Sequence, residues 1–368
     1  MTETLVGGVL AAVLALATRQ SLLGHDVTVI YPRKPAVPAA AELDARFPSD
    51  VRRVELTYRG RVATLRDLRV AIRGADRDMD VLHLHSTFAG IAGRLPFVRV
   101  PDGCVVAYSP HGFAFLRESS SAVSNLAALA LERVLKPRCD GLILVSPSEE
   151  AVARTRLGES HCDVLQNGIP VDGLPRAHGS GNPRPVVVAS GRLGEQKGPD
   201  RFAEVARALG DRADFVWIGD GPREGRERWM GDAPVRLTGW LSHEDVIAQL
   251  AASDIFLFPT RWEGMPISLM EAQVMGLPAV ATDIVGNRDV VLSGETGYLC
   301  SDVPDLIAAV SSLVDDPLER SRMSARALEV QRDRLSDIDL GTASIQVYDR
   351  MAARVSDPMR PSDGAVGA

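Results

Sequence analysis

Hydrophobic residues of this chain fall into short, nearly continuous runs separated by longer amphipathic stretches. Continuous apolar runs are typical of parallel strands covered by helices on both faces, and the stretches between them predict those helices. In the first half the runs are Val27–Tyr31, Val54–Thr57, Val81–His85, Cys104–Tyr108, Leu142–Ser146 and Asp163–Gln166.

A second alternating set begins at Val186. Its predicted strands are Val186–Ser190, Asp214–Ile218, Val235–Thr238, Ile255–Pro259 and Ala279–Thr282. Two successive sets of this kind predict an α/β protein with two Rossmann-like, doubly wound parallel-sheet domains and a cleft between them.

Glycine and proline set the expected domain boundaries. The segment Gly173–Pro185 contains three glycines and three prolines and is predicted to be a linker. The first domain would then comprise residues 1–172 and the second residues 186–336. A helix at residues 337–356 and a disordered tail at residues 357–368 are expected to follow.

Composition narrows the class of protein. The chain has 368 residues, 45% of them hydrophobic, and a net charge of −7, which argues against a nucleic-acid partner. Its four cysteines form no C-x-x-C pair, so neither a zinc site nor a disulfide framework is expected, and a reducing cytoplasm is indicated. The apolar run Leu5–Ala17 is too short to span a bilayer and is interpreted as a buried helix.

Two glutamates eight positions apart flank a turn and the start of a short apolar helix. Glu263 precedes the Gly-Met-Pro turn, and Glu271 lies just over one turn inside the predicted helix. A helix N-terminus attracts anions and carboxylates accept hydrogen bonds from hydroxyls, which together suit a nucleotide sugar. A solvated Glu263 and a dipole-stabilised Glu271 would give the same spacing.

A second motif, SGRLGEQKG, follows the first strand of the second set. Arg192 and Lys197 stand five apart in a loop that contains glycine and leads into a helix. Loop amides and two cations together predict a diphosphate clamp, whereas the alternative is a pair of exposed loop cations.

These two motifs resemble those of retaining family-4 glycosyltransferases of the GT-B fold, which carry an E-x7-E motif and a G-R-x(4)-K loop. Further similar segments, PHGFAFL at 110–116 and VLQNGIPVD at 164–172, occur in the family's order. The resemblance implies transfer of a hexose from a nucleotide diphosphate sugar, with UDP favoured, to an acceptor hydroxyl with retention. The implied setting is exopolysaccharide, cell-envelope or glycolipid synthesis, with a saccharide or lipid-linked acceptor.

The resemblance also implies residue roles. Arg192 and Lys197 would stabilise the leaving diphosphate, Glu263 would position the sugar hydroxyls, Glu271 would bind the ribose, and His111 would orient the sugar. His111 could instead satisfy a buried loop carbonyl. Donor contacts are further implied for Gly7, Gly8, Trp240, Gly264, Met265, Ile267 and Ser268.

Three of these positions carry open questions. Trp240 would stack on the nucleobase or belong to the core. Only six residues precede Gly7 and Gly8, so the first strand of the first domain is expected to be short or missing. An upstream extension is then expected to raise solubility, because a sheet without that strand exposes edges.

No metal cofactor is expected. His83 and His85 share one face of a strand but have no third ligand beside them, so a structural or acceptor-side role is favoured. Asp76, Asp78 and Asp80 form overlapping D-x-D patterns in a polar segment before a buried strand, a poor context for a metal.

The segment Arg52–Arg73 contains seven arginines and only two acidic residues. Leu65, Leu68 and Ile72 form an apolar stripe there, flanked by arginines. The stretch is either a solvated helix face or a surface that meets anionic lipid, which would place a cytoplasmic enzyme at the inner face of the membrane.

Two rival functions remain at this point. One is a nucleotide-sugar 2-epimerase on the same fold, for which the first domain offers no clear acid–base carboxylates. The other is a non-catalytic subunit, suggested by the short first strand and opposed by the presence of both glutamates, Arg192 and Lys197.

Overall fold

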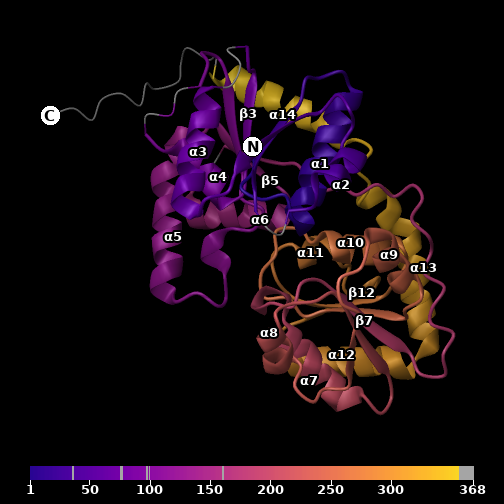
Figure 1. Ribbon diagram of the computed structural model, residues 1–368. Helices are drawn as coiled ribbons and strands as arrows, with labels where there is room; N and C mark the ends of the chain where they lie inside the picture. Colours follow the sequence, from indigo (N-terminus) through magenta and orange to yellow (C-terminus); the bar gives the residue numbers. More distant parts are fainter. Residues whose placement is uncertain (35–36, 75–77, 97, 99, 160, 356–368) are drawn as a thin grey trace. The chain divides into compact units, whose positions relative to one another are not determined.

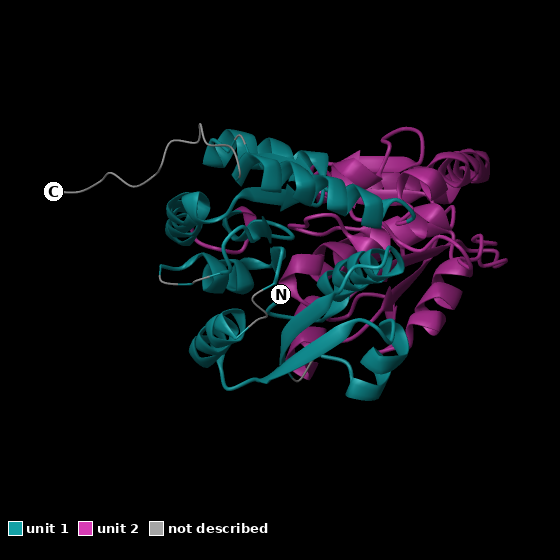
Figure 2. Cartoon of the chain, turned by 90° about the horizontal axis from the view of Figure 1, so that it is seen from above, with its two compact units in different colours: residues 1–115, 122–166, 338–368 teal, residues 116–121, 167–337 magenta. Residues whose placement is uncertain are grey.

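The computed structural model describes residues 1–34, 37–74, 78–96, 98, 100–159 and 161–355 (Figure 1). The chain divides into two compact units, coloured separately in Figure 2. Unit 1 comprises residues 1–115, 122–166 and those from 338 onward, and unit 2 comprises residues 116–121 and 167–337. The tail at 357–368 that was predicted to be disordered lies outside the described residues.

Unit 1 is built on parallel strands. They are β1 (Thr28–Arg33), β2 (Arg52–Thr57), β3 (Val81–His85), β4 (Val105–Ser109), β5 (Gly141–Leu144) and β6 (Cys162–Val164). β1 pairs with β2, and β3, β4, β5 and β6 form a sheet in that order. Thr2 joins the two groups, because it bridges His85 of β3 while its N–H donates to the Ile30 carbonyl of β1 at 3.0 Å.

Helices cover these strands. They are α1 (Gly7–Leu22), α2 (Ala40–Arg46), α3 (Arg61–Arg73), α4 (Thr87–Arg94), α5 (Ala122–Leu135), α6 (Pro147–Val152) and α14 (Leu340–Val355), with short turns η1 (Ala114–Leu116), η2 (Lys136–Arg138) and η3 (Ala153–Leu157). The apolar run predicted to be a buried helix is α1, whose apolar side packs into the core.

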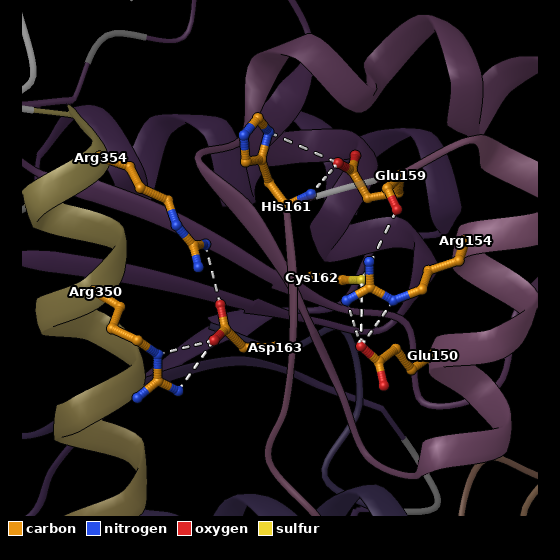
Figure 3. A network of polar contacts seen from close by, with 8 residues as sticks. All are labelled: Glu150, Arg154, Glu159, His161, Cys162, Asp163, Arg350 and Arg354. Carbon is orange, nitrogen blue, oxygen red and sulfur yellow. Dashed lines mark hydrogen bonds and ion pairs between the residues drawn. The ribbon is translucent and has the colours of Figure 1, made fainter.

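Helix α14 is held in unit 1 at both ends. Gly341 lets it approach α1, since a Cβ there would lie 2.7 Å from the Arg19 carbonyl oxygen. Further along, Arg350 and Arg354 donate to the Asp163 carboxylate of β6 at 3.0 and 3.1 Å (Figure 3). The last helix of the chain is therefore part of unit 1.

Unit 2 contains one six-stranded parallel sheet. Its strands are β7 (Val186–Ser190), β8 (Asp214–Ile218), β9 (Val235–Leu237), β10 (Ile255–Phe258), β11 (Ala279–Thr282) and β12 (Gly297–Cys300), in the order β12-β11-β10-β7-β8-β9. Every strand predicted from the sequence in either unit lies within two residues of an observed one, and β12 was not predicted. The expected α/β architecture with two parallel-sheet domains is confirmed.

The helices of unit 2 are α7 (Pro199–Leu209), α8 (Arg223–Trp229), α9 (His243–Ala251), α10 (Ile267–Val274), α11 (Asn287–Val290), α12 (Val303–Asp315) and α13 (Pro317–Arg334), with one short turn, η4 (Glu195–Lys197). Phe202 of α7 packs edge-on against Phe215 and Trp217 of β8 and is fully buried. This aromatic contact fixes α7 against the sheet, and with it the loop that leads into α7.

The segment Gly173–Pro185, expected to be a linker, belongs to unit 2. Ala177 N–H donates to the Met275 carbonyl at 2.7 Å, and His178 N–H donates to the Ala251 carbonyl at 2.9 Å. These backbone bonds tie the segment to the ends of α9 and α10. Apart from the short segment 116–121, the chain passes between units at residues 166–167 and 337–338 instead.

Candidate functional site

The strand order of unit 2 reverses beside β7. From β7 the chain continues through β8 and β9 on one side, whereas β10, β11 and β12 lie on the other. In open parallel sheets, ligands bind at the carboxyl ends of the strands where the order reverses. The loops that leave β7 and β10 at this point carry the two motifs identified from the sequence.

The loop after β7 is folded tightly around glycine. Residues Glu195–Lys197 form the 3₁₀ turn η4, and Gly198 ends it with a φ of 65°. A Cβ at position 198 would lie 2.1 Å from the Pro259 carbonyl oxygen at the end of β10. Glycine therefore provides both the left-handed backbone and the space that this close approach requires.

This turn brings Lys197 to Glu263. Lys197 Nζ donates to Glu263 Oε1 at 2.7 Å and lies 4.9 Å from the centre of the Phe258 ring. Glu263 is buried, and a buried carboxylate needs such a partner. One residue from each motif thus meets the other at the reversal point of the sheet.

Arg192 is arranged differently. Its side chain is exposed, and it makes no ion pair or side-chain hydrogen bond within the described part of the chain. The two basic residues of the expected clamp therefore differ, since Lys197 is engaged by a carboxylate and Arg192 projects into solvent.

A second ion pair holds the two loops together. Arg261 donates to both oxygens of Asp200, at 2.8 and 2.5 Å, and its N–H donates to the Gln196 carbonyl at 2.8 Å. Gln196 returns a bond from Nε2 to the Trp262 carbonyl at 3.0 Å. Sequence reasoning missed Asp200 and Arg261, and their role is to position the loops rather than to face a ligand.

The turn before α10 is supported from behind. A Cβ on Gly286 would lie 2.4 Å from the Gly264 carbonyl oxygen, and Asn167 Nδ2 donates to the Met265 carbonyl at 3.1 Å. Ile267 and Ser268 form the first turn of α10, and Pro266 before them provides no side-chain cap. First-turn amides of a helix have no partner within the helix and so favour an anion.

Glu271, one turn into α10, has a partner that the sequence did not suggest. Its Oε1 lies 2.8 Å from Nε2 of His243, the first residue of α9. Glu271 is largely buried, whereas His243 is mostly exposed. The histidine could have been found only from the pairing of α9 with α10, since no local pattern marks it.

Trp240 lies in the loop between β9 and α9, three residues before His243. Its side chain is 66% exposed, which excludes the alternative that it belongs to the core. An exposed indole in a loop at the carboxyl edge of the sheet remains available for stacking on a base.

In unit 1, His111 occupies the loop after β4 in a left-handed conformation with a φ of 54°. Gly112 N–H donates to the buried Glu149 at 2.7 Å, which holds this loop to the start of α6. His111 Nε2 lies 2.9 Å from His85 Nδ1, so its partner is a second imidazole rather than a carbonyl. Burial lowers the pKa of His111 to about 4.

His83, beside His85 on β3, belongs to a fully satisfied network. Ser109 Oγ donates to the Ile143 carbonyl at 2.6 Å and therefore accepts from His83 Nε2 at 2.8 Å. His83 Nδ1 then accepts from the Tyr348 hydroxyl of α14 at 2.9 Å. Burial lowers the pKa values of His83 and His85 well below 6.5, so both rings are neutral.

The structure describes two of the three aspartates of the D-x-D pattern. Asp78 and Asp80 are exposed, and Asp76 lies outside the described residues. Among the residues that the structure describes, no group of three histidine, cysteine, aspartate or glutamate side chains could hold a metal ion.

Gly7 and Gly8 form the first turn of α1, and both are exposed. Gly7 has a φ of 54°, and a Cβ there would meet nothing within 4 Å. Glycine at position 7 is therefore explained by its backbone conformation and not by crowding.

The apolar stripe predicted to dock on a membrane is not available for docking. Leu68 and Ile72 of α3 are buried, at 0% and 2% exposure, because this face of the helix packs into unit 1. The stripe packs this helix on the sheet, which requires the same spacing, and docking of the arginines themselves on anionic lipid stays a prediction. Arg66 and Arg73 remain exposed on the other side.

Comparisons with known proteins identify the family. Residues 6–172 match the family described as Glycosyltransferase Family 4, and residues 184–316 match the family described as Glycosyl transferases group 1. The UDP-Gal:alpha-D-GlcNAc-diphosphoundecaprenol alpha-1,3-galactosyltransferase of Escherichia coli is 28% identical over 64% of this chain and 67% of its own length. The phosphatidyl-myo-inositol mannosyltransferase of Mycobacterium tuberculosis is 29% identical over 89% of each chain.

Among solved structures, sucrose-phosphate synthase from Thermosynechococcus elongatus is similar in fold. The TM-score is 0.78 at 18% identity, and the match covers 92% of both chains. The chain belongs to the group 1, family 4 glycosyltransferases with the GT-B fold. It is a glycosyltransferase that uses a sugar nucleotide as its donor.

Proposed function

We propose that this protein transfers a hexose from a UDP-sugar, with retention, to a hydroxyl of a saccharide or lipid-linked acceptor in cell-envelope polysaccharide or glycolipid synthesis. The contact between Lys197 and Glu263 at the reversal point of the unit 2 sheet carries the proposal. The donor and the acceptor class are supported by the E. coli relative, whose name specifies UDP-Gal and a diphosphoundecaprenol acceptor, and by the phosphatidyl-myo-inositol mannosyltransferase.

In the free protein, Lys197 and Glu263 neutralise each other. A bound donor supplies both replacements: its phosphates attract the ammonium, and its sugar hydroxyls donate to the carboxylate. Arg192 and the first turn of α10 add positive potential where charge builds on the departing diphosphate. Stabilising that charge is the main contribution to catalysis.

The remaining roles follow the same proposal. Glu271 accepts from the ribose hydroxyls, and Trp240 stacks on the base. Gly264, Met265, Ile267 and Ser268 present backbone at the start of α10. Gly7 and Gly8 of unit 1 offer amides to the donor, and His111 orients the sugar near its reacting carbon.

No metal is assigned a role, because the residues proposed to hold the diphosphate are themselves cationic. Within the described residues, no helix is both long and apolar enough to cross a membrane. We place the reaction in the cytoplasm, at the inner face of the membrane if the acceptor is lipid-linked.

The proposed reaction is tested by measuring UDP release from UDP-hexoses with and without a diphosphoundecaprenol-linked saccharide, in EDTA. Acceptor-dependent release and an equatorial anomeric proton in the product are expected when an α-linked donor is used. Consumption of the donor without acceptor and without UDP release, as a second sugar nucleotide accumulates, would indicate an epimerase. Activity that EDTA abolishes and manganese restores would contradict the metal-free mechanism.

The diphosphate clamp makes a separate prediction. Lys197→Ala and Arg192→Ala should each weaken UDP binding by about tenfold or more but barely change uridine binding, because a charge-assisted contact to phosphate contributes roughly 1.5–3 kcal/mol. Isothermal titration measures both ligands. Arg212→Ala is the matched control, since Arg212 precedes β8 at the opposite edge of the sheet and pairs with Asp315. Equal losses for UDP and uridine would refute the clamp.

A further inference from the structure

Helix α5 of unit 1 has its hydrophobic side facing solvent. Val123, Leu126 and Val134 are 78%, 65% and 63% exposed, and Ala127 and Ala130 between them are exposed as well. On a helical wheel these residues share one side. Val123, Ala127, Ala130 and Val134, at positions i, i+4, i+7 and i+11, lie along its centre. The opposite side carries Glu132 and Leu135, the buried residues of the helix.

A buried ion pair holds the helix in this orientation. Glu132 Oε2 accepts from Arg94 Nη2 of α4 at 2.8 Å, and Glu132 Oε1 accepts from the Tyr108 hydroxyl of β4 at 3.1 Å. Arg94 is 1% exposed and stacks on the Tyr108 ring at 3.7 Å. Rotating α5 to bury its apolar side would pull Glu132 away and leave Arg94 buried without a carboxylate, which is strongly unfavourable.

Positive charge surrounds the C-terminal end of this apolar side. Arg133 donates to the Arg156 carbonyl at 2.7 Å, and Arg138 donates to the Val134 carbonyl at 3.0 Å. Within the described residues, neither arginine is paired with a carboxylate, and the same is true of the exposed Arg156. Figure 3 shows the neighbouring Arg154, which is paired with Glu150 at 2.7 Å. Glu132, the one carboxylate in residues 122–135, is buried.

We propose that the exposed face of α5, comprising Val123, Leu126, Ala127, Ala130, Leu131 and Val134, docks on an anionic phospholipid surface. An apolar face with a basic rim and no exposed carboxylate on the helix matches acyl chains beneath anionic headgroups. With 14 residues, α5 is about 21 Å long, too short to cross a bilayer, so it lies in the plane of the interface.

A membrane fits this face better than a second copy of the chain does. A partner copy would bring the same uncompensated arginines and no carboxylate to meet them, whereas anionic headgroups complement them. The proposal is independent of the reaction proposed above, because it concerns only how unit 1 meets a lipid surface. Figure 1 shows α5 along the outside of unit 1, with no other element of that unit over its outer side.

The test is co-sedimentation of the full chain with phosphatidylcholine vesicles, with and without phosphatidylglycerol, at low and high salt. Binding to anionic vesicles that salt weakens is expected. Val134→Glu should lower it about tenfold or more, because an apolar contact is replaced by a charge. Arg138→Gln should lower it about fivefold on anionic vesicles only.

Val62→Glu is the matched control, because Val62 is 82% exposed on α3 of the same unit. All three substitutions are at exposed positions, and thermal melting checks that each variant is folded. Absence of binding to anionic vesicles, equal binding to neutral ones, or an equal loss in Val62→Glu would overturn the proposal. The proposal would also be overturned if the native chain does not bind vesicles but forms a dimer in sedimentation velocity that Val134→Glu dissociates.

Discussion

Glu263→Gln is expected to lower kcat by about a hundredfold, with a much smaller change in KM for the donor. The variant keeps the size of the side chain but removes the negative charge that Lys197 faces at 2.7 Å. A charge-assisted contact contributes roughly 1.5–3 kcal/mol, and removing one preorganised catalytic contact typically costs about 10² to 10³ in rate. Steady-state and single-turnover kinetics would separate the chemical step from binding.

Glu195→Gln provides the control for this variant. Glu195 is exposed in the same pair of loops, and the ion pair of Lys197 is made with Glu263 and not with Glu195. Its kcat should remain close to that of the native enzyme. Full activity of Glu263→Gln would remove Glu263 from the reaction and leave it as the buried counterion of Lys197.

The two residues should also act as a unit. In the double variant Glu263→Gln, Lys197→Met, the loss should be smaller than the sum of the two single losses in free energy, because each single change leaves the other partner without its contact. Additive losses would indicate that the ion pair of the free protein is unrelated to catalysis.

Acid is expected to destabilise unit 1 through its histidine cluster. Burial holds the pKa of His111 at about 4 and the pKa values of His83 and His85 well below 6.5. Between those values and 6.5, the unfolded chain binds protons that the folded cluster does not, so stability falls as pH falls below 6.5. Each histidine contributes up to about 1.4 kcal/mol per pH unit in this window.

The hydrogen bonds explain why the cluster resists protonation. His83 Nδ1 accepts from Tyr348, and the contact between His85 and His111 needs one nitrogen to donate and the other to accept. Protonating both of the latter rings would place two N–H groups against each other.

Chemical denaturation between about pH 7 and pH 5 measures this effect as a change in the free energy of unfolding, across the window where histidine titrates. His85→Gln, which does not titrate, should reduce the pH dependence. His161→Gln, at an exposed histidine, should leave it unchanged. A stability curve that is flat below pH 6.5 in the native chain would show that the cluster already carries its protons.

The sequence predicted those elements whose cause is local. Parallel strands of unit 2 appear as apolar runs because both faces of the sheet are covered, and the four strands from Val186 to Phe258 were placed within one residue. Glu263 and Lys197 were predicted as site residues from their motifs. Their direct contact was not, because it depends on the pairing of β7 with β10, which are far apart in the chain.

Features that depend on tertiary packing were missed or misinterpreted. The α3 stripe of Leu68 and Ile72 has the same spacing whether the helix packs on a sheet or on lipid. The segment Gly173–Pro185 has the composition of a linker, yet its backbone bonds place it in unit 2. His243 and the loop-binding pair Asp200–Arg261 lie on elements that come together only in the folded unit.

The close approach of Gly198 to Pro259 has a consequence for evolution and for engineering. Two conditions coincide there, a φ of 65° and a distance of 2.1 Å from a would-be Cβ to the Pro259 carbonyl oxygen. Gly194, four residues earlier, has an extended backbone and nothing closer than 4.0 Å to its would-be Cβ. In a library randomised across this loop, functional clones should retain glycine at position 198 and accept many residues at position 194. Substitutions that change donor preference are therefore better sought at position 194.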